Sequence, residues 1–242
     1  MVHALIHFAP MQGYTDARYR RRHFQDYGGV ACYYTPFVRW ERDGVRAKDR
    51  RDVLPAANRG VPVVPQIIAA GYDEFCHLCD FLQKLGWNRI DLNMGCPFPM
   101  QTGHGRGAGL LQYPDRVEAM IREMEVRKEV TFSVKMRLGQ RSVSEWFALL
   151  PLLNAAPLRH IALHPRLGIQ QYEGEPDMEA FARCYEQCRI PLIYNGDIAE
   201  VRQIVALQRE YPRLEGVMIG RGLIRCPQLA RDYALYVAKG GK

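Results

Sequence analysis

Short β-rich runs alternate with amphipathic, helix-like stretches along almost the whole chain. We expect strands at residues 5–10, 31–35, 63–68, 89–94, 131–137, 159–164, 190–195 and 215–219. Most of them are followed by a helical pattern, for example at residues 73–86, 115–127, 176–188 and 199–209. Apolar runs separated by helices are typical of a parallel sheet that is covered by helices. Eight such units predict an α/β fold of the (β/α)8, or TIM-barrel, class.

The length of the chain agrees with one barrel. Its 242 residues lie within the range that a single barrel of this kind reaches. We find no Ser/Gly-rich linker, compositional break or short internal repeat, so we expect a single domain over residues 1–242. The alternative fold is an open, doubly wound sheet. Such a sheet usually carries GxGxxG after its first strand, whereas the first strand here ends in APMQG at residues 9–13.

A barrel makes the residues that end its strands candidates for function, because the working residues of such barrels lie at the carboxyl ends of the strands. The residues that fall at these positions are Pro10, Met11, Arg39, Gln66, Asn93, Cys96, Lys135, Arg137, His164, Asn195, Gly196, Asp197, Gly220 and Arg221.

The segment DLNMGCPFPMQTGHGRGAGLL at residues 91–111 holds a cysteine in a constrained loop. Gly95 and Pro97 restrict the backbone on either side of Cys96, and alternating glycines follow as far as Gly109. Glycines allow another backbone or a flat ligand to come close. We therefore take Cys96 as a candidate for chemistry. The alternative is a free cysteine that is buried as a small apolar residue.

Two loops have the composition of a phosphate site. NGD at residues 195–197 follows the seventh expected strand, and GRG at residues 220–222 follows the eighth. Barrel phosphate sites are built from these last two loops, with backbone N–H groups and a nearby helix start. NGD alone is also an ordinary turn sequence. Because GRG follows one unit later, we interpret both as phosphate-binding loops, with Arg221 adding a positive charge.

The chain is basic, and the excess charge is uneven. The formal net charge is +7, and residues 16–52 carry ten Lys and Arg against six Asp and Glu. A basic face raises the local concentration of polyanions and would suit RNA phosphates. The alternative is a solvated helix face. The most basic run contains Arg18, Arg20, Arg21 and Arg22.

Seven cysteines and no secretory signal indicate free thiols in the reducing cytoplasm. Cys76 and Cys79, and likewise Cys184 and Cys188, have the spacing of one helix face. Zinc would require both pairs to converge, so we expect no metal site. The apolar start MVHALIHFAPM is too short to span a membrane and is interrupted by Pro10, so we expect a first strand there.

The chain resembles the flavin-dependent dihydrouridine synthases, which reduce uridines in RNA. The resemblance begins with NxGCP and the glycine-rich loop that ends in GAGLL. A set of blocks in a fixed order is much more specific than any one block. The nearest subgroup is that of the bacterial synthases that act on a single tRNA uridine. The other blocks are APMQG at 9–13, TPFVR at 35–39, PQI at 65–67, SVKMRLG at 133–139, HPRLGIQQYEG at 164–174, NGDI at 195–198 and IGRG at 219–222.

The resemblance implies flavin mononucleotide (FMN) as the cofactor. A cation beside the pyrimidine end of a flavin stabilises the anionic reduced ring, so Lys135 is expected to tune the cofactor. Gln66 can both donate and accept along the ring edge. For His164, the alternative is a buried core histidine. By resemblance, the FMN-binding residues are Ala9, Pro10, Met11, Gln66, Lys135, His164, Asn195, Gly196, Asp197, Gly220 and Arg221.

The resemblance also implies a substrate and a reaction. Asn93 and Arg137 are expected to hold the target uracil of a tRNA, and Arg39 to lie at the rim that faces the RNA. The expected reaction delivers hydride from reduced flavin to uracil C6, while Cys96 protonates C5 as the general acid. The family pattern implies NADPH as the reductant, although no separate dinucleotide fingerprint is visible. The uridine must leave its stack to react.

The chain departs from the family pattern in two places. Family members usually continue into a C-terminal helical domain that helps to bind tRNA, but only PQLARDYALYVAKGGK follows the eighth expected strand. We expect that domain to be absent or truncated and the basic run at 18–22 to compensate. Leu167 stands where a threonine is frequent. Two alternatives are a flavin barrel that acts on a free pyrimidine or another RNA, and a non-catalytic RNA-binding barrel.

Overall fold

The computed structural model describes residues 3–42 and 44–241. In them, β-strands alternate with helices along the chain. The strands are β1 (Leu5–Phe8), β2 (Cys32–Tyr34), β3 (Val38–Glu41), β4 (Gly44–Val45), β5 (Val63–Val64), β6 (Gln66–Ile68), β7 (Arg89–Met94), β8 (Thr131–Gly139), β9 (Leu158–Leu167), β10 (Leu192–Tyr194) and β11 (Gly216–Ile219). The helices are α1 (Ala17–Asp26), α2 (Ala47–Asp52), α3 (Tyr72–Lys84), α4 (Pro99–Thr102), α5 (Pro114–Val126), α6 (Ser144–Ala155), α7 (Met178–Gln187), α8 (Val201–Glu210), α9 (Arg221–Arg225) and α10 (Leu229–Ala238). Three short 3₁₀ helices are η1 (Pro55–Asn58), η2 (Gly107–Gln112) and η3 (Gly168–Gln170).

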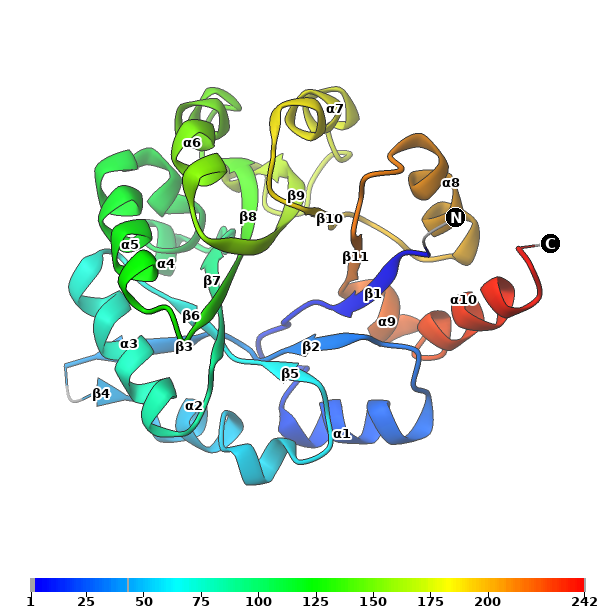
Figure 1. Ribbon diagram of the computed structural model, residues 1–242, viewed down its shortest axis with the longest axis horizontal. Coiled ribbons are helices and arrows are strands. Elements are labelled where there is room, and N and C mark those ends of the chain that lie inside the picture. The colour runs from blue at the N-terminus through cyan, green and yellow to red at the C-terminus, as the bar shows by residue number, and fades with distance from the viewer. Residues whose placement is uncertain (1–2, 43, 242) are drawn as a thin grey trace.

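The strands close into a ring with the helices outside it (Figure 1). Hydrogen bonding places the strands in the order β4-β3-β6-β7-β8-β9-β10-β11-β1-β2-β5. Only Pro65 separates β5, which pairs with β2, from β6, which pairs with β7, so these two segments together close the ring. Proline has no N–H for the ladder, which explains the interruption. Every pair is parallel except β3 with β4. This arrangement confirms the predicted TIM barrel and excludes the alternative, an open doubly wound sheet.

Strand limits differ from expectation where proline or a partner strand intervenes. The strand at Arg89–Met94 is observed as expected, whereas the one expected at 63–68 is divided at Pro65. The first strand ends at Phe8, two residues before Pro10. Strands β3 and β4 were not expected. They form because β6 offers a hydrogen-bonding edge to residues 38–39, a partner that local sequence does not reveal.

The main core lies between the strands and the helices, and a smaller one lies inside the barrel. Helix α3 shows why the sequence builds the outer core. Its buried side chains Phe75, Leu78, Cys79 and Leu82 recur every three or four residues, which places them on one face. Of the two cysteines in this helix, Cys79 belongs to the buried face and Cys76 is only partly buried. All seven cysteines are free. The inner cluster consists of Ala9, Cys32, Tyr34, Val64, Ala162, Ile193 and Met218.

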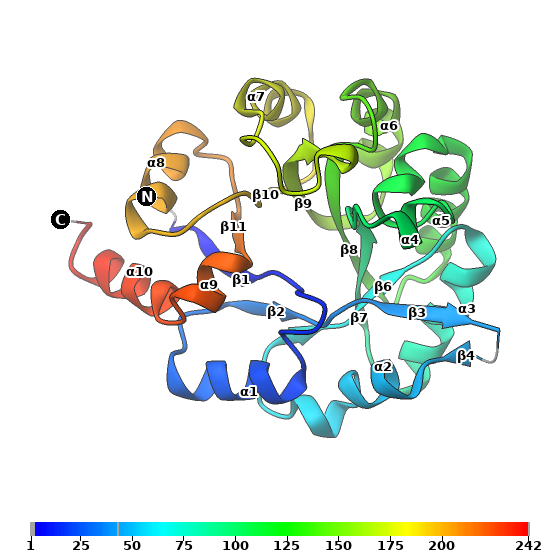
Figure 2. The same ribbon diagram turned by 180° about the vertical axis from the view of Figure 1, so that it is seen from behind.

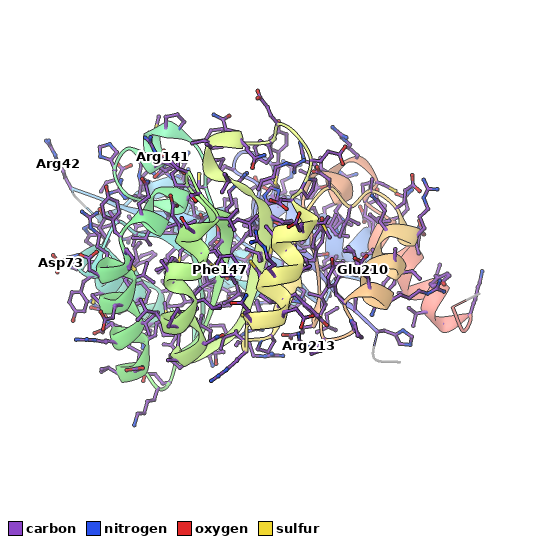
Figure 3. All side chains as sticks on the ribbon, turned by 90° about the horizontal axis from the view of Figure 1, so that it is seen from above. Arg42, Asp73, Arg141, Phe147, Glu210 and Arg213 are labelled. Atoms are coloured by element: carbon purple, nitrogen blue, oxygen red, sulfur yellow. The ribbon has the colours of Figure 1, made fainter. Side chains whose placement is uncertain are left out.

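The parallel ring has two distinct ends. Figure 3 shows Arg42 and Arg141, which follow β3 and β8, at one edge of the molecule, and Arg213, which precedes β11, at the opposite edge. Figure 2 shows α9 and α10 beside β1 and α8. Helix α10 packs on both α8 and α9. Within the described residues, no helix combines the length and the apolar character that a membrane span requires.

The basic run in α1 does not form one continuous surface. Arg20 is only 1% exposed. Its guanidinium donates to Asn58 Oδ1 at 2.7 Å and to Asp52 Oδ2 at 3.1 Å, so it ties α1 to the end of α2 and to η1. This corrects the expectation that Arg20 belongs to an RNA-facing patch, because a buried and paired cation is not available to phosphate. The exposed members of the run are Arg18, Arg21 and Arg22.

Candidate functional site

A cavity of about 290 Å³ opens at the carboxyl ends of the strands. Its volume is at the lower end of the range for ligand sites, about 300–1,000 Å³. The loops after β1, β7, β9, β10 and β11 form its wall, and side chains from β6, β7 and β8 form its base. The predicted site residues that line it are Ala9, Pro10, Met11, Gln66, Asn93, Cys96, Lys135, Arg137, His164, Asn195, Gly196, Asp197, Gly220 and Arg221.

Arg39 is the predicted site residue that the structure leaves outside this cavity. It lies on β3, where its guanidinium forms an ion pair with Glu41, and its side chain is 17% exposed. The hairpin of β3 and β4 holds this pair at the same end of the barrel as the cavity.

Cys96 is both packed and accessible from the cavity. The residue is 8% exposed and contacts Phe37 and Ile68, yet it forms part of the cavity wall. Its carbonyl accepts a hydrogen bond from the Ala108 N–H at 2.9 Å, which folds the glycine-rich loop back over it. Burial raises the pKa of the thiol above 9.0, and a hydrogen bond from the Phe98 N–H only partly offsets this. The thiol is therefore protonated at neutral pH.

Asn93 shapes the turn that carries Cys96. Its Oδ1 accepts hydrogen bonds from the Gly95 N–H at 3.0 Å and from the Cys96 N–H at 2.8 Å. Its Nδ2 donates to Gln66 Oε1 at 2.8 Å. An amide nitrogen has two N–H groups, so one remains for a ligand in the cavity.

A buried carboxylate lies behind Gln66. Asp91 is fully buried on β7 and accepts from Gln66 Nε2 at 2.7 Å and from Ser133 Oγ at 2.6 Å. Burial raises the pKa of Asp91 to about 6, against the opposing effects of these hydrogen bonds and of Lys135. The sequence prediction did not include Asp91 in the site. The signal was an acidic residue within an otherwise apolar strand, which is rarely buried without a partner.

Lys135 contributes a cation to the base of the cavity. Its ammonium forms no hydrogen bond or ion pair with residues 3–42 or 44–241. Burial lowers the pKa of Lys135 to about 8, and the neighbouring Arg137 acts in the same direction, while Asp91 and Cys96 oppose it. A cation of this kind is available to a negatively charged ligand atom.

Arg137 connects two loops around the cavity. Its guanidinium donates to the carbonyl oxygens of Gly95 at 3.0 Å, Leu167 at 2.9 Å and Gln171 at 2.6 Å. The residue is 1% exposed. It therefore joins the Cys96 turn to the loop after β9, and only its remaining donors are free for a substrate.

Charged residues at the carboxyl ends of three consecutive strands, β9, β10 and β11, pair with one another beside the cavity. Arg166 donates to the Gly174 carbonyl at 2.6 Å and forms an ion pair with Asp197. Asp197 also pairs with Arg221. Burial opposes ionisation of Asp197, but the two guanidinium groups outweigh it and lower its pKa. Arg166 was missed by the sequence prediction, although HPR places it on the same strand face as His164.

His164 is neutral in this environment. Burial is the main reason that its pKa lies well below 6.5, and the positive charges of Arg137, Lys135, Arg166 and Arg221 add to the effect. Its Nε2 lies 3.1 Å from Arg166 Nη1 and accepts its hydrogen bond, because a guanidinium can only donate. The single ring proton is then on Nδ1. His164 is thus a buried residue that also lines the cavity.

The cavity has features that suit a planar ligand with a phosphate group. The backbone N–H groups of Gly196, Asp197 and Gly220 donate no hydrogen bond within the described chain, so they can receive an anion. Arg221 starts α9 beside them. A Cβ atom on Gly220 would lie 3.1 Å from Met11 Sδ, so the loops after β1 and β11 meet closely there. The donor set therefore fits FMN. No three His, Cys, Asp or Glu side chains in the described residues are placed to hold a metal ion.

Solved structures with similar folds support the barrel class. Histamine dehydrogenase from Rhizobium sp. 4-9 superimposes with a TM-score of 0.67 at 12% identity, over 98% of this chain and 46% of that chain. N-(5′-phosphoribosyl)anthranilate isomerase from Pyrococcus furiosus gives a TM-score of 0.59 at 11% identity, over 98% of this chain and all of that chain. At such identities the similarity establishes the fold alone.

Sequence comparison identifies the family. The profile of dihydrouridine synthase (Dus) matches residues 7–241, and the chain belongs to this family. It is 27% identical to tRNA-dihydrouridine synthase B of Pasteurella multocida over 93% of this chain and 68% of that protein. It is 28% identical to tRNA-dihydrouridine(16) synthase of Haemophilus ducreyi over 97% of this chain and 74% of that protein. The resemblance inferred from the sequence blocks is thereby confirmed.

Proposed function

We propose that the protein reduces uridine to 5,6-dihydrouridine in tRNA, with FMN as cofactor and NADPH as reductant. Family membership and the names of the bacterial relatives support the reaction class. The observation that carries the proposal is the cavity itself, in which a protonated cysteine and an unpaired lysine share one space with anion-binding backbone groups.

The cofactor site is assigned to the part of the cavity built from the last strands. The free N–H groups of residues 196–197 and 220, with Arg221, would hold the phosphate, and the backbone of residues 9–11 would lie against the ring. Lys135 would stabilise negative charge on the ring, and His164 offers its Nδ1 proton as a donor. Gln66 is held by Asp91 and Asn93, which leaves one of its N–H groups for the ring edge. A reduced flavin bound here supplies a hydride to C6 of the uracil.

Cys96 supplies the proton in this proposal. A general acid must keep its proton until the reaction, and a buried thiol with a raised pKa does so. The proton goes from Sγ to C5 of the uracil, and the resulting thiolate lies near the positive charges of Lys135 and Arg137. The tight turn around Asn93 limits the movement of the thiol, which is the positional control that proton transfer requires.

The substrate would occupy the space between Cys96 and the flavin position. Asn93 and Arg137 each keep N–H groups that their structural hydrogen bonds do not use, and these can donate to the uracil carbonyl oxygens. Arg39, outside the cavity at the same end of the barrel, would contact the RNA backbone. In this proposal the residues of the barrel carry out the chemistry.

The test is a flavin reoxidation assay with purified protein. The protein is loaded with FMN, reduced anaerobically with NADPH and mixed with unmodified tRNA, while the flavin absorption is followed. We expect tRNA to reoxidise the flavin and dihydrouridine to form in the RNA. Reoxidation by free uracil or orotate but not by tRNA would replace the proposal with a free-pyrimidine oxidoreductase. Failure to bind FMN would refute it.

A further inference from the structure

Two aromatic side chains stand exposed at the mouth of the cavity. Tyr14, after β1, is 63% exposed, and Phe98, after β7, is 48% exposed. Both line the cavity, although they come from different loops. We call these two rings the aromatic rim. Large exposed apolar groups beside a site of this kind are typical of contact surfaces.

The backbone of each rim residue is fixed. The N–H groups of Tyr14 and Thr15 both donate to the Met11 carbonyl, at 3.0 and 3.1 Å, which closes a tight turn. Phe98 precedes α4, and its carbonyl accepts from the N–H groups of Gln101 at 2.8 Å and Thr102 at 3.0 Å. Ordered loops therefore hold both rings in exposed positions. Because these loops are already ordered, binding of a ligand to the rings costs little conformational entropy.

Neither rim ring has an aromatic or cationic partner among the described residues. Tyr172, another exposed ring of the cavity wall, differs in this respect. The guanidinium groups of Arg137 and Arg221 lie over its ring at 5.5 and 4.9 Å from the centroid. The faces of Tyr14 and Phe98 are thus free to stack with a flat ligand.

The surroundings favour nucleobases as that ligand. The chain has a formal net charge of +7, and Lys135 and Arg221 add positive charge within the same cavity. Aromatic faces next to basic groups are the usual surface for single-stranded nucleic acid. A uridine that enters the cavity leaves its stack, so the bases on either side of it lose a stacking partner.

We propose that Tyr14 and Phe98 stack against the nucleobases that flank the target uridine. The inference rests on the proposed function, because it takes the RNA strand as the substrate. It assigns the rim to the RNA beyond the reacting base. The rim therefore distinguishes an RNA substrate from a free pyrimidine, which has no flanking bases.

The test measures the binding of a short single-stranded oligoribonucleotide with one central uridine. Fluorescence anisotropy is recorded on oxidised, flavin-loaded protein without reductant, so that no turnover occurs. We expect Tyr14→Ala and Phe98→Ala each to weaken binding about fivefold or more, the range reported for one base stacked on an aromatic ring. Binding of uridine monophosphate should be unchanged in both. Tyr14→Phe and Phe98→Tyr should restore oligonucleotide binding.

The controls separate stacking from general damage. Tyr72 is also 48% exposed but lies outside the cavity, so Tyr72→Ala should bind the oligonucleotide normally. Tyr14→Leu and Phe98→Leu keep an apolar side chain without a stacking face, and should weaken binding as the alanine variants do. Equal binding by all variants, or equal weakening for uridine monophosphate, would overturn the inference. A raised KM for NADPH alone would instead assign the rim to the reductant and also overturn it.

The inference and the proposed function can fail separately. If wild-type protein reduces tRNA and the rim variants keep the wild-type KM for tRNA, only the inference is wrong. If wild-type protein binds the oligonucleotide through the rim but no RNA reoxidises its flavin, only the proposed reaction is wrong.

Discussion

Cys96 is the residue whose chemical state most directly determines the proposed reaction. Burial keeps its thiol protonated, because the charged thiolate is disfavoured in a poorly solvated position. In the proposed mechanism, substitution of this group removes the proton donor and leaves the proposed phosphate- and ring-binding residues in place. The binding of the cofactor and the chemical step can thus be measured separately.

We expect Cys96→Ala to retain FMN and to lose roughly 10²- to 10⁴-fold in turnover of tRNA, the usual contribution of a general acid. The measurement is the single-turnover rate of flavin reoxidation. An acid is lost when it deprotonates, so the wild-type rate should decline as the pH rises through the pKa of the thiol, which burial raises above 9.0. This limb lies above the one expected from Lys135, whose pKa is about 8. Cys96→Ala should lack that alkaline limb. An unchanged rate in the variant would remove Cys96 from the mechanism.

Asn93 acts on Cys96 through the backbone. Its Oδ1 is the acceptor for two buried N–H groups, those of Gly95 and Cys96. Leaving a buried donor without a partner costs about 1–3 kcal/mol. We therefore expect Asn93 to contribute both to the free energy of unfolding and to the position of the Cys96 thiol.

We expect Asn93→Ala to lower the free energy of unfolding by about 1–3 kcal/mol and to speed alkylation of Cys96 by iodoacetamide. Urea unfolding and mass spectrometry of the modified cysteine measure the two effects. Asn154→Ala is the control, because the Asn154 amide also bonds backbone groups, at Gln187 and Arg189, but in a solvent-accessible position. If the control accelerates alkylation equally, the effect is not local to the turn.

At the scale of elements, the loop after β7 is built to pack on the cysteine. Arg106 pairs with Glu74 of α3, and Glu74 Oε2 also accepts from the Ala70 N–H at 3.0 Å. These contacts hold the loop against the neighbouring strand unit. Gly107 then brings the chain so close to Cys96 that a Cβ atom would lie 2.6 Å from its carbonyl oxygen and 2.8 Å from its Cβ.

We expect Gly107→Ala to destabilise the protein and to displace Cys96. The substitution introduces this contact and also a side chain at a φ of +58°. Gly60→Ala is a matched control, because Gly60 has a φ of +79° but nothing within 4 Å of the added Cβ. The control should lose only the backbone cost of about 1–2 kcal/mol, and Gly107→Ala should lose about 1–3 kcal/mol more from overpacking. Equal losses in urea unfolding would show that the loop adapts.

At the scale of the whole molecule, the barrel interior holds polar side chains at both ends. Opposite the cavity, Tyr34 Oη lies 3.1 Å from His7 Nδ1 and 2.9 Å from His160 Nε2. Burial lowers the pKa of His7 to about 4 and that of His160 to about 3, with the nearby arginines adding to both shifts. The folded protein therefore holds both rings neutral at a pH where the unfolded chain protonates them.

This difference predicts a loss of stability on acidification. Because the unfolded chain binds more protons, the free energy of unfolding should fall as the pH drops from about 6.5 toward 4, by about 1–2 kcal/mol per histidine by pH 5. Asp91 opposes this, since its raised pKa of about 6 favours the folded state as the pH falls through that value. Urea unfolding at pH values from 7 to 5 measures the net change in the free energy of unfolding from the two histidines and Asp91.

His160→Phe isolates the histidine contribution. The variant keeps a ring of similar size, and Tyr34 keeps His7 as its partner, so the folded structure should persist. We expect the dependence of the unfolding free energy on pH to become weaker than in the wild type. An identical dependence would assign the acid sensitivity to other groups.

The sequence determined the order of the elements and most of the chemistry at the strand ends. Alternating apolar and amphipathic runs gave the barrel, because a parallel sheet needs helices on its outer face. The motif blocks indicated the family, and the residues they marked lie around one cavity, apart from Arg39. Local sequence patterns suffice for these predictions, because the ends of strands and the composition of loops can be recognised from neighbouring residues in the sequence.

Only the tertiary structure decided which of these residues form hydrogen bonds and ion pairs with one another. Arg20 reads as part of a basic surface, yet it is buried against Asp52 and Asn58, which lie far along the chain. Asp91 and Arg166 gained their roles from partners on other strands, and β3 formed because β6 offered it an edge. The physical reason is the same in each case. Burial and pairing depend on neighbours in space, and closing the ring supplies neighbours that are not adjacent in the sequence.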